Sequence, residues 1–154
     1  MEMKITAQEE YGLRCLLQLA RSTQDQVVRV KDIAAYEGLS SAYVEKLLRL
    51  LARAGLVHSI RGVKGGYVLN RPGAAITLGE VIRALGTVQT TDHICHRFTG
   101  NVSTCVHFSN CGIRSVWSGL TTYIQKFLDQ ITLASLIGNE YTVSSRLAKR
   151  AAVL

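Results

Sequence analysis

Residues 38–70 read GLSSAYVEKLLRLLARAGLVHSIRGVKGGYVLN, a pattern typical of one helix followed by a hairpin. Ser40 or Ser41 can cap a helix that runs to about Ala54, where Gly55 stops it. Short apolar segments then flank a glycine-rich stretch that carries two cations. This arrangement predicts a β-hairpin that projects beyond the helices.

A second helix is predicted just upstream, from Val30 to Tyr36, and Gly38 is placed to end it in a left-handed conformation. Two short helices separated by a Gly-Leu-Ser turn make a helix-turn-helix. With strands at 56–60 and 66–70, the motif becomes a winged helix. In that fold the second helix of the motif can lie in the major groove of DNA, while the wing meets phosphates or a minor groove.

The flanking segments also have helical periodicity. An amphipathic helix is predicted from Ala7 to Arg21, and Thr77 with Glu80 forms a capping box for another. A longer helix starts near Cys111 and carries a sustained apolar stripe. The stripe consists of Ile113, Val116, Trp117, Leu120, Ile124, Phe127 and Ile131. A small domain offers little surface to bury it, so we expect a dimerisation helix; the alternative is that it packs on its own winged helix.

The predicted fold class is therefore mainly α with a small β-hairpin, a winged helix-turn-helix plus a long C-terminal dimerisation helix. The expected organisation is a DNA-binding domain at 1–85 and a cysteine-containing loop at 86–111. A dimerisation region at 112–140 and a flexible basic tail at 141–154 follow.

Composition narrows the class of protein. The chain has 154 residues, 47% of them apolar, and a net charge of +7. It is too short for a large two-domain enzyme, and no apolar run approaches the roughly 20 residues that span a bilayer. The first residues lack the pattern of a signal peptide, so we expect a cytoplasmic protein. In that reducing compartment, four cysteines favour metal binding, redox chemistry or packing over disulfides; Cys15, among leucines, is assigned to packing.

Positive charge is concentrated in one part of the chain. Between Lys46 and Gly79 there are six basic residues and no acidic one. Taken alone, such a cluster is more often a solvated face. On a helix-turn-helix and its wing it favours an anionic partner such as a phosphate backbone.

Three cysteines fall in or just after an irregular stretch of the sequence. Nine residues separate Cys95 from Cys105, and five separate Cys105 from Cys111. Three thiolates on one loop can bind a soft metal centre, although no spacing matches the paired CxxC of a structural zinc ribbon. Buried, inert thiols are the alternative.

The chain resembles the small dimeric winged-helix regulators that bind an iron–sulfur cluster. The resemblance covers nearly the whole chain. It rests on the Met3-Lys-Ile-Thr opening with Glu10-Tyr-Gly-Leu-Arg14, on residues 39–45 and 55–67, and on the three cysteines. It continues through Cys111-Gly-Ile-Arg-Ser-Val-Trp117 and residues 131–136.

The resemblance implies that Cys95, Cys105 and Cys111 hold the cluster, with 4Fe–4S favoured over 2Fe–2S. Cluster-assembly regulators take a histidine three residues beyond the last cysteine, where this chain has Arg114. Nitric-oxide-sensing members use a carboxylate from the partner's first helix, which matches Glu10. The alternative fourth ligands in the loop are His93, His96 and His107.

The resemblance also implies which side chains meet DNA. Base and wing contacts are expected from the recognition helix and hairpin, and further cations contribute charge. A departure is Ala42, where relatives can carry a serine. The DNA-contacting set is Ser40, Ser41, Tyr43, Glu45, Lys46, Arg49, Arg61 and Lys64.

The predicted function is a homodimeric transcriptional regulator, most simply a repressor, that binds a double-stranded DNA operator and not a membrane. Operator binding is controlled by an iron–sulfur cluster that responds to nitric oxide, redox state or iron supply. The alternative is a winged-helix regulator with a zinc or thiol-redox site. A metalloenzyme or electron carrier is disfavoured, since the sequence has no second redox motif and no nucleotide-binding loop.

Overall fold

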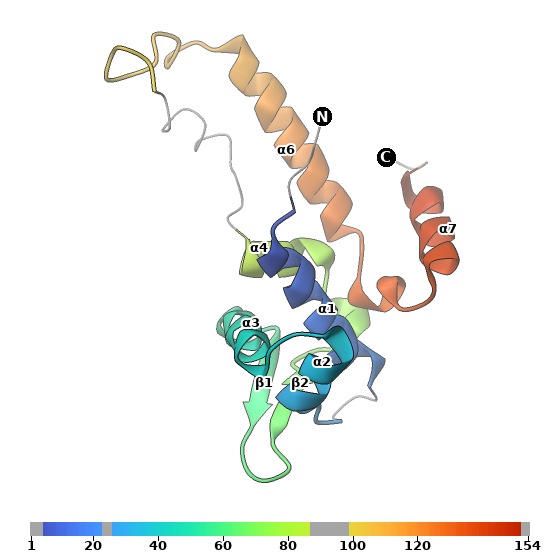
Figure 1. The fold of residues 1–154 in the computed structure, drawn as a ribbon. Coiled ribbons are helices and arrows are strands. Elements are labelled where there is room, and N and C mark those ends of the chain that lie inside the picture. The colour runs from blue at the N-terminus through green and yellow to red at the C-terminus, as the bar shows by residue number, and fades with distance from the viewer. Residues whose placement is uncertain (1–4, 23–25, 87–98, 152–154) are drawn as a thin grey trace.

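The structure is a computed structural model and describes residues 5–22, 26–86 and 99–151. It confirms the predicted fold class: helices dominate, and two short antiparallel strands form a wing (Figure 1). The winged-helix part consists of α1 (Ala7–Arg21), α2 (Val30–Glu37), α3 (Ser41–Arg53), β1 (Val57–Ile60), β2 (Gly66–Leu69) and α4 (Leu78–Leu85). The C-terminal part consists of α6 (Gly112–Asp129), a 3-10 turn at Leu133–Leu136 and α7 (Glu140–Ala151).

Local capping chemistry sets the helix boundaries. The Ser40 side chain accepts a hydrogen bond from the amide of Tyr43, so Ser40, and not Ser41, caps α3. Gly38 ends α2 with φ +67°, a conformation that side chains with a Cβ rarely adopt. Thr77 and Glu80 form the predicted capping box of α4, and Thr6 with Glu9 forms a second one at α1.

One hydrophobic core lies among α1, α2, α3, the wing and α4. Leu16, Ile33, Leu47 and Val81 are almost completely buried in it. The chain returns to this core after α6: Ile131 and Leu133 are buried, and the backbones of Thr77 and Thr132 pair. The C-terminal end of α6 is thus fixed to the winged helix.

The wing is tied to the connection between α1 and α2. Val28 and Tyr67 exchange two backbone hydrogen bonds of 3.0 and 2.9 Å. This strand-like contact brings the two backbones so close that a Cβ on Gly66 would lie 2.3 Å from the carbonyl oxygen of Val28. A glycine is therefore required at position 66, and the wing has a defined orientation.

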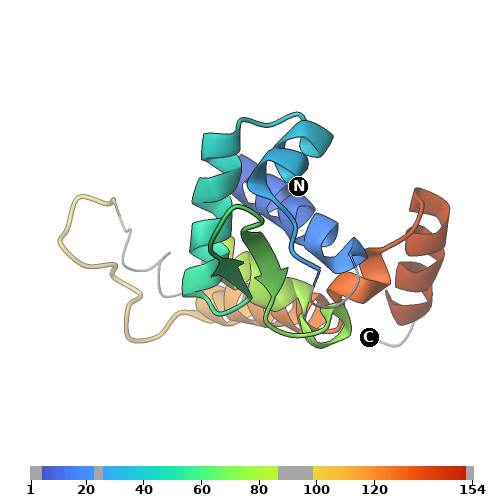
Figure 2. The ribbon, with the colours of Figure 1, turned by 90° about the horizontal axis from the view of Figure 1, so that it is seen from below.

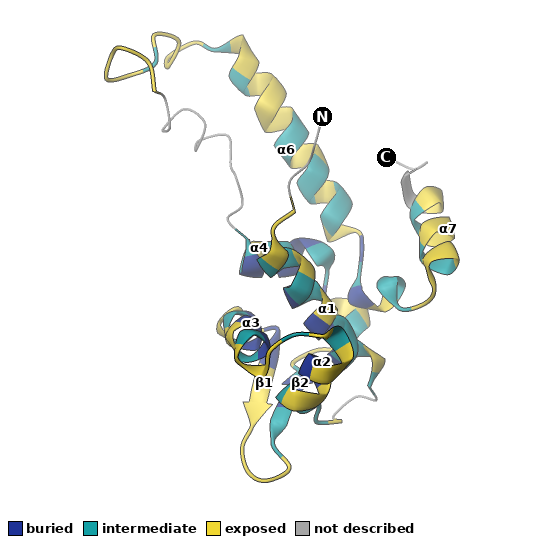
Figure 3. Cartoon of the chain, in the orientation of Figure 1, coloured by how far each residue is buried: buried dark blue, intermediate teal, exposed yellow. Residues whose placement is uncertain are grey.

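The long helix α6 extends away from this core. None of its residues is buried, and its N-terminal half exposes Ile113, Val116 and Trp117 (Figure 3). Its C-terminal end packs on α4, where Arg83 and Asp129 form a 2.8 Å ion pair. Half of the apolar stripe therefore does not pack on its own winged helix. The predicted stripe extended one residue too far, because α6 ends at Asp129 and Ile131 lies outside the helix.

A helix occupies most of the segment for which a flexible basic tail was expected. Residues of α7 follow Asn139, whose side-chain oxygen accepts from the amide of Thr142. Arg146 donates to the carbonyl oxygens of Ser135 and Ile137. These contacts join α7 to the turn before it. Seen from below, α7 and residues 99–111 lie on opposite sides of the molecule (Figure 2).

Candidate nucleic-acid interface and cysteine loop

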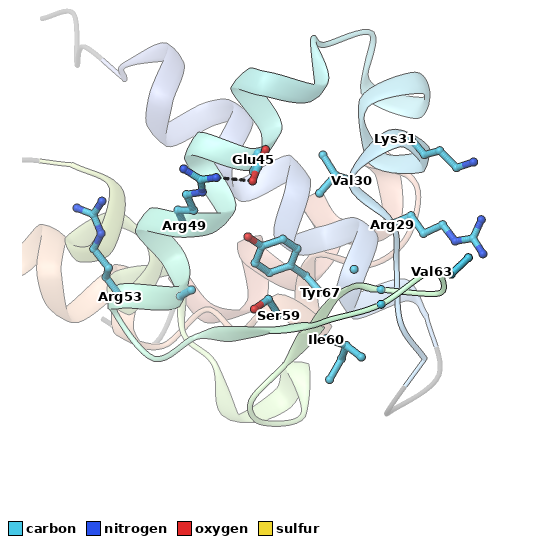
Figure 4. Close-up of a pocket in the computed structure, with 14 residues that line it drawn as sticks. Arg29, Val30, Lys31, Glu45, Arg49, Arg53, Ser59, Ile60, Val63 and Tyr67 are labelled. Carbon is cyan, nitrogen blue, oxygen red and sulfur yellow. Dashed lines mark hydrogen bonds and ion pairs between the residues drawn. The ribbon is translucent and has the colours of Figure 1, made fainter.

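A groove of about 910 Å³ lies between α3, the wing and the start of α2. Arg29 and Lys31 stand on one side of it and Arg49 and Arg53 on the other, with Tyr67 between them (Figure 4). Its only carboxylate among the lining residues that the structure describes is Glu45. Four cations against one carboxylate give the groove a field that favours an anion.

Glu45 and Arg49 form an ion pair on the face of α3 that borders the groove. The Nη2 atom of Arg49 lies 2.5 Å from Oε1 of Glu45, one helical turn away. The hydrogen bond that Arg49 donates to this carboxylate raises the pKa of Arg49. From the sequence, Glu45 and Arg49 are predicted as separate DNA-contacting residues. In the structure the two side chains pair with each other across one turn of α3.

The other predicted contact residues lie on α3, at its N-cap and at the tip of the wing. Ser40, Ser41 and Lys46 are exposed on α3, and Arg61 and Lys64 are exposed at the wing tip. Tyr43 is half-buried, and its ring meets the ring of Tyr11 edge-on with centroids 6.2 Å apart.

Three cations on the groove, Arg29, Lys31 and Arg53, are absent from the predicted DNA-contacting set. Arg29 is the residue before α2, and Lys31 belongs to its first turn. Both precede the basic run that begins at Lys46, and only the pairing of Val28 with Tyr67 brings them beside the wing. The alternating Val-Arg-Val-Lys pattern was the available signal, since it suggests an extended segment next to a strand.

Two of the three loop cysteines lie in the part of the chain that the structure describes. Cys105 and Cys111 are free thiols, each partly exposed. They belong to residues 99–111, which lie beyond the end of α6 that is far from the winged helix (Figure 1). Cys105 begins a turn in which its carbonyl oxygen accepts from the amide of Phe108 at 2.9 Å. Cys111 is the residue that precedes α6. Cys95, His93 and His96 lie outside the described residues, whereas His107 is exposed.

Glu10 and the cysteine loop of the same chain lie in different regions. Glu10 is exposed in the first turn of α1 and pairs with Arg14, whereas the loop lies beyond the distant end of α6. Among the residues that the structure describes, no three His, Cys, Asp or Glu side chains converge closely enough to hold a metal ion. Within one chain, Glu10 therefore does not join the described cysteines. Cys15 is fully buried in the core, as the packing assignment expected.

Comparison with known proteins assigns the chain to a family. The sequence profile of the Rrf2 family, described as iron-dependent transcriptional regulators, matches residues 5–139. The chain belongs to the Rrf2 family. The HTH-type transcriptional regulator IscR of Yersinia pestis is 35% identical to this Rrf2 protein over 139 residues, which are 90% of this chain and 81% of IscR.

Solved structures of Rrf2 relatives have the same fold. IscR of T. potens is 34% identical, with a TM-score of 0.69 over 89% of this chain and 88% of its own. CymR of B. subtilis, a global cysteine regulator, is 32% identical, with a TM-score of 0.68 over 88% of this chain and 96% of its own. The chain is therefore a DNA-binding transcriptional regulator of the winged-helix type, and its family is not an enzyme class. In the described ranges, no helix has the length and apolar character needed to cross a membrane.

The cysteine loop of this Rrf2 protein has donor groups that suit a thiolate-ligated metal centre. Cys105 and Cys111 are free thiols on adjoining turns, and thiolate sulfur is a soft donor of the kind such a centre needs. Nε of Arg114 is buried and has no hydrogen-bond partner among the described residues. Arg114 contacts the Cys105–Phe108 turn through Phe108. An unsatisfied cationic N–H on the segment that carries both thiols fits an anionic centre of thiolate and metal.

Proposed function

We propose that this protein is a homodimeric repressor whose operator binding is controlled by an iron–sulfur cluster. In this proposal Cys95, Cys105 and Cys111 hold the cluster together with Glu10 of the partner subunit. The observation that carries the cluster proposal is the pair of free, partly exposed thiols at Cys105 and Cys111. Arg114, whose Nε has no partner among the described residues, contacts Phe108 on the segment between them.

The groove beside α3 is proposed as the phosphate-binding part of the DNA interface. Four cations line it, and phosphate contacts supply most of the salt-dependent affinity of DNA-binding proteins. Ser40 and Ser41, exposed at the start of α3, approach the DNA backbone. The Glu45 carboxylate accepts a hydrogen bond from a base edge such as cytosine N4. Arg61 and Lys64 extend the contact along the wing.

Dimerisation through α6 is proposed from its exposed apolar side chains. Two recognition helices must be held at a fixed separation to contact half-sites one or more turns, about 34 Å each, apart. A bound cluster would supply a centre that reacts with nitric oxide, oxidants or chelators. Because Glu10 lies on α1, which packs on α3, its engagement by the other subunit would bias the placement of the recognition helices.

A second candidate is a zinc or thiol-redox sensor. Cys105 and Cys111 are free, partly exposed thiols, and CymR, which is a cysteine regulator in B. subtilis, is similar in fold and sequence. Two thiols on neighbouring turns suit a redox switch as well as a metal site.

Native mass spectrometry of anaerobically purified protein separates these candidates. A dimer mass that exceeds the apoprotein by two 4Fe–4S or two 2Fe–2S clusters supports the proposal. Two zinc ions, or a metal-free dimer after attempted reconstitution, would remove the cluster proposal and favour the second candidate. An electrophoretic mobility-shift assay then compares the affinity of the cluster-loaded and the cluster-free dimer for operator DNA. Equal affinity in both states would contradict control of DNA binding by the cluster.

A further inference from the structure

The side chain of Arg114 folds back from the first turn of α6 onto the turn that carries Cys105. Its Nη2 atom donates to the carbonyl oxygen of Phe108, and its Cζ atom lies 5.4 Å from the centroid of the Phe108 ring. A guanidinium over an aromatic face gains a cation–π attraction, which adds to the hydrogen bond. Arg114 therefore links the Cys105–Phe108 turn to the helix that begins after Cys111.

One donor of this guanidinium has no partner. The Nε atom is buried, and no described residue accepts its proton. A buried, unpaired N–H of a cation costs free energy unless an acceptor completes it. Arg114 follows Cys111 by three residues, so it lies on the same side of α6 about one turn further on. The missing acceptor is therefore expected at the cysteines.

We propose that Arg114 is a positioning residue for the cysteine site, with two separable roles. It clamps the Cys105 turn against α6, and it presents Nε–H to the sulfur atoms of an anionic metal–thiolate centre. The second role rests on the proposed function; the first does not. Hydrogen bonds to cluster sulfurs stabilise the charge of such centres and tune their potential, so this residue would slow loss of the bound group.

Arg114→Gln tests both roles and Arg114→Lys separates them. In cluster-free protein, hydrogen-exchange mass spectrometry of residues 99–111 should show the Phe108 amide exchanging about fivefold faster in Arg114→Gln, as expected for loss of one stabilising hydrogen bond. In anaerobically reconstituted dimer, transfer of iron to a chelator should be about 10–100-fold faster. Lysine keeps the charge and one contact to Phe108, so exchange should stay near wild type while iron transfer accelerates.

The matched control is Lys126→Gln, which removes an exposed cation from the same helix. It should leave both rates unchanged. Unchanged exchange in Arg114→Gln overturns the clamp, and unchanged iron transfer in both Arg114 variants overturns the donor role. If the wild-type protein takes up no cluster, the proposed function and the donor role fail together, and the exchange measurement still decides the clamp.

Discussion

Nη2 of Arg14 lies 2.6 Å from Oε1 of Glu10, so the proposed cluster ligand is paired, within its own chain, with a cation one helical turn along α1. The hydrogen bonds that Arg14 donates to Glu10 raise the pKa of Arg14. The same guanidinium lies 4.0 Å from Glu37, whose side chain is only 9% exposed at the end of α2. If the cluster of the other subunit bound the Glu10 carboxylate, Glu37 would remain as the carboxylate partner of Arg14. Glu37 lies next to the turn that leads into α3.

Glu10→Ala tests the fourth ligand. Both partners of the Glu10–Arg14 pair are about half exposed, so the free energy of unfolding of the cluster-free protein should change by less than about 0.5 kcal/mol. Retention of the cluster against a chelator should instead fall about tenfold or more. Iron transfer followed by absorbance checks this, and His107→Ala is the matched comparison. Faster loss in His107→Ala with no change in Glu10→Ala would assign the ligand to the loop.

Arg29→Ala tests the groove as a phosphate-binding surface. If Arg29 contacts one phosphate, the slope of log K against log salt should become shallower by about 0.9, with similar loss for operator and unrelated DNA. Fluorescence anisotropy over a range of salt concentrations measures the slope. Lys126→Ala, on α6 away from the groove, should keep the wild-type slope, and an unchanged slope in Arg29→Ala would place the residue outside the interface.

Gly66→Ala should damage the wing. The new Cβ would lie 2.3 Å from the Val28 carbonyl oxygen, which is backbone and cannot move without breaking the pairing to Tyr67. We expect a loss of about 1–3 kcal/mol in the free energy of unfolding, measured with urea, and weaker DNA binding. Gly73→Ala is the control, because its nearest neighbour would be 3.4 Å away. Equal stability of the two variants would show that the wing adjusts freely.

Cys15 should make stability depend on pH in the alkaline range. Burial raises the pKa of its thiol from 9.0 to about 12, and the nearby carboxylate of Glu37 adds to the shift. The folded state holds the proton more tightly than the unfolded chain, so this stabilisation is complete below about pH 9 and is lost as the pH rises towards 12. Urea unfolding between about pH 9 and pH 11 should show a steeper decline for wild type than for Cys15→Ala. Parallel curves would contradict the burial argument.

Val116→Glu should disrupt the dimer. Val116 is 66% exposed on the stripe of α6, and a buried, unpaired carboxylate at an apolar contact is strongly unfavourable. The dimer dissociation constant should rise about 100-fold or more, measured by analytical ultracentrifugation. Thr122→Glu places the same charge about half a helical turn from the stripe and should leave the dimer intact. A dimer unaffected by Val116→Glu would mean that α6 is not its interface.

Local chemistry made the winged helix predictable. Gly38 and the Thr77–Glu80 box mark helix ends through their own backbone and side-chain bonds, so their positions follow from sequence. Arg29 could not be placed in the groove in this way, because its position depends on the distant pairing of Val28 with Tyr67.

Long-range and side-chain contacts explain the remaining differences. The helix α7 was missed because contacts such as those of Arg146 with Ser135 and Ile137 become visible only after the chain has turned. The orientation of Arg114 towards Phe108 likewise depends on how the loop folds. The ligand assignments for Cys95, Cys105, Cys111 and Glu10, the DNA-contacting set and the domain boundaries stay predictions.

The winged helix holds α6 at its C-terminal end, so a small rotation there becomes a larger displacement at its N-terminal end. Its 18 residues span about 27 Å, and its base is held by the Arg83–Asp129 pair and by the buried side chains of Ile131 and Leu133. A tilt of about 10° at that base moves the cysteine end by about 5 Å, as rigid helix geometry requires. Conversely, a displacement of a few ångströms at Cys111 reaches the DNA-binding unit as a small rotation. The length of α6 therefore sets the ratio between a displacement at Cys111 and the rotation at the opposite end of the helix.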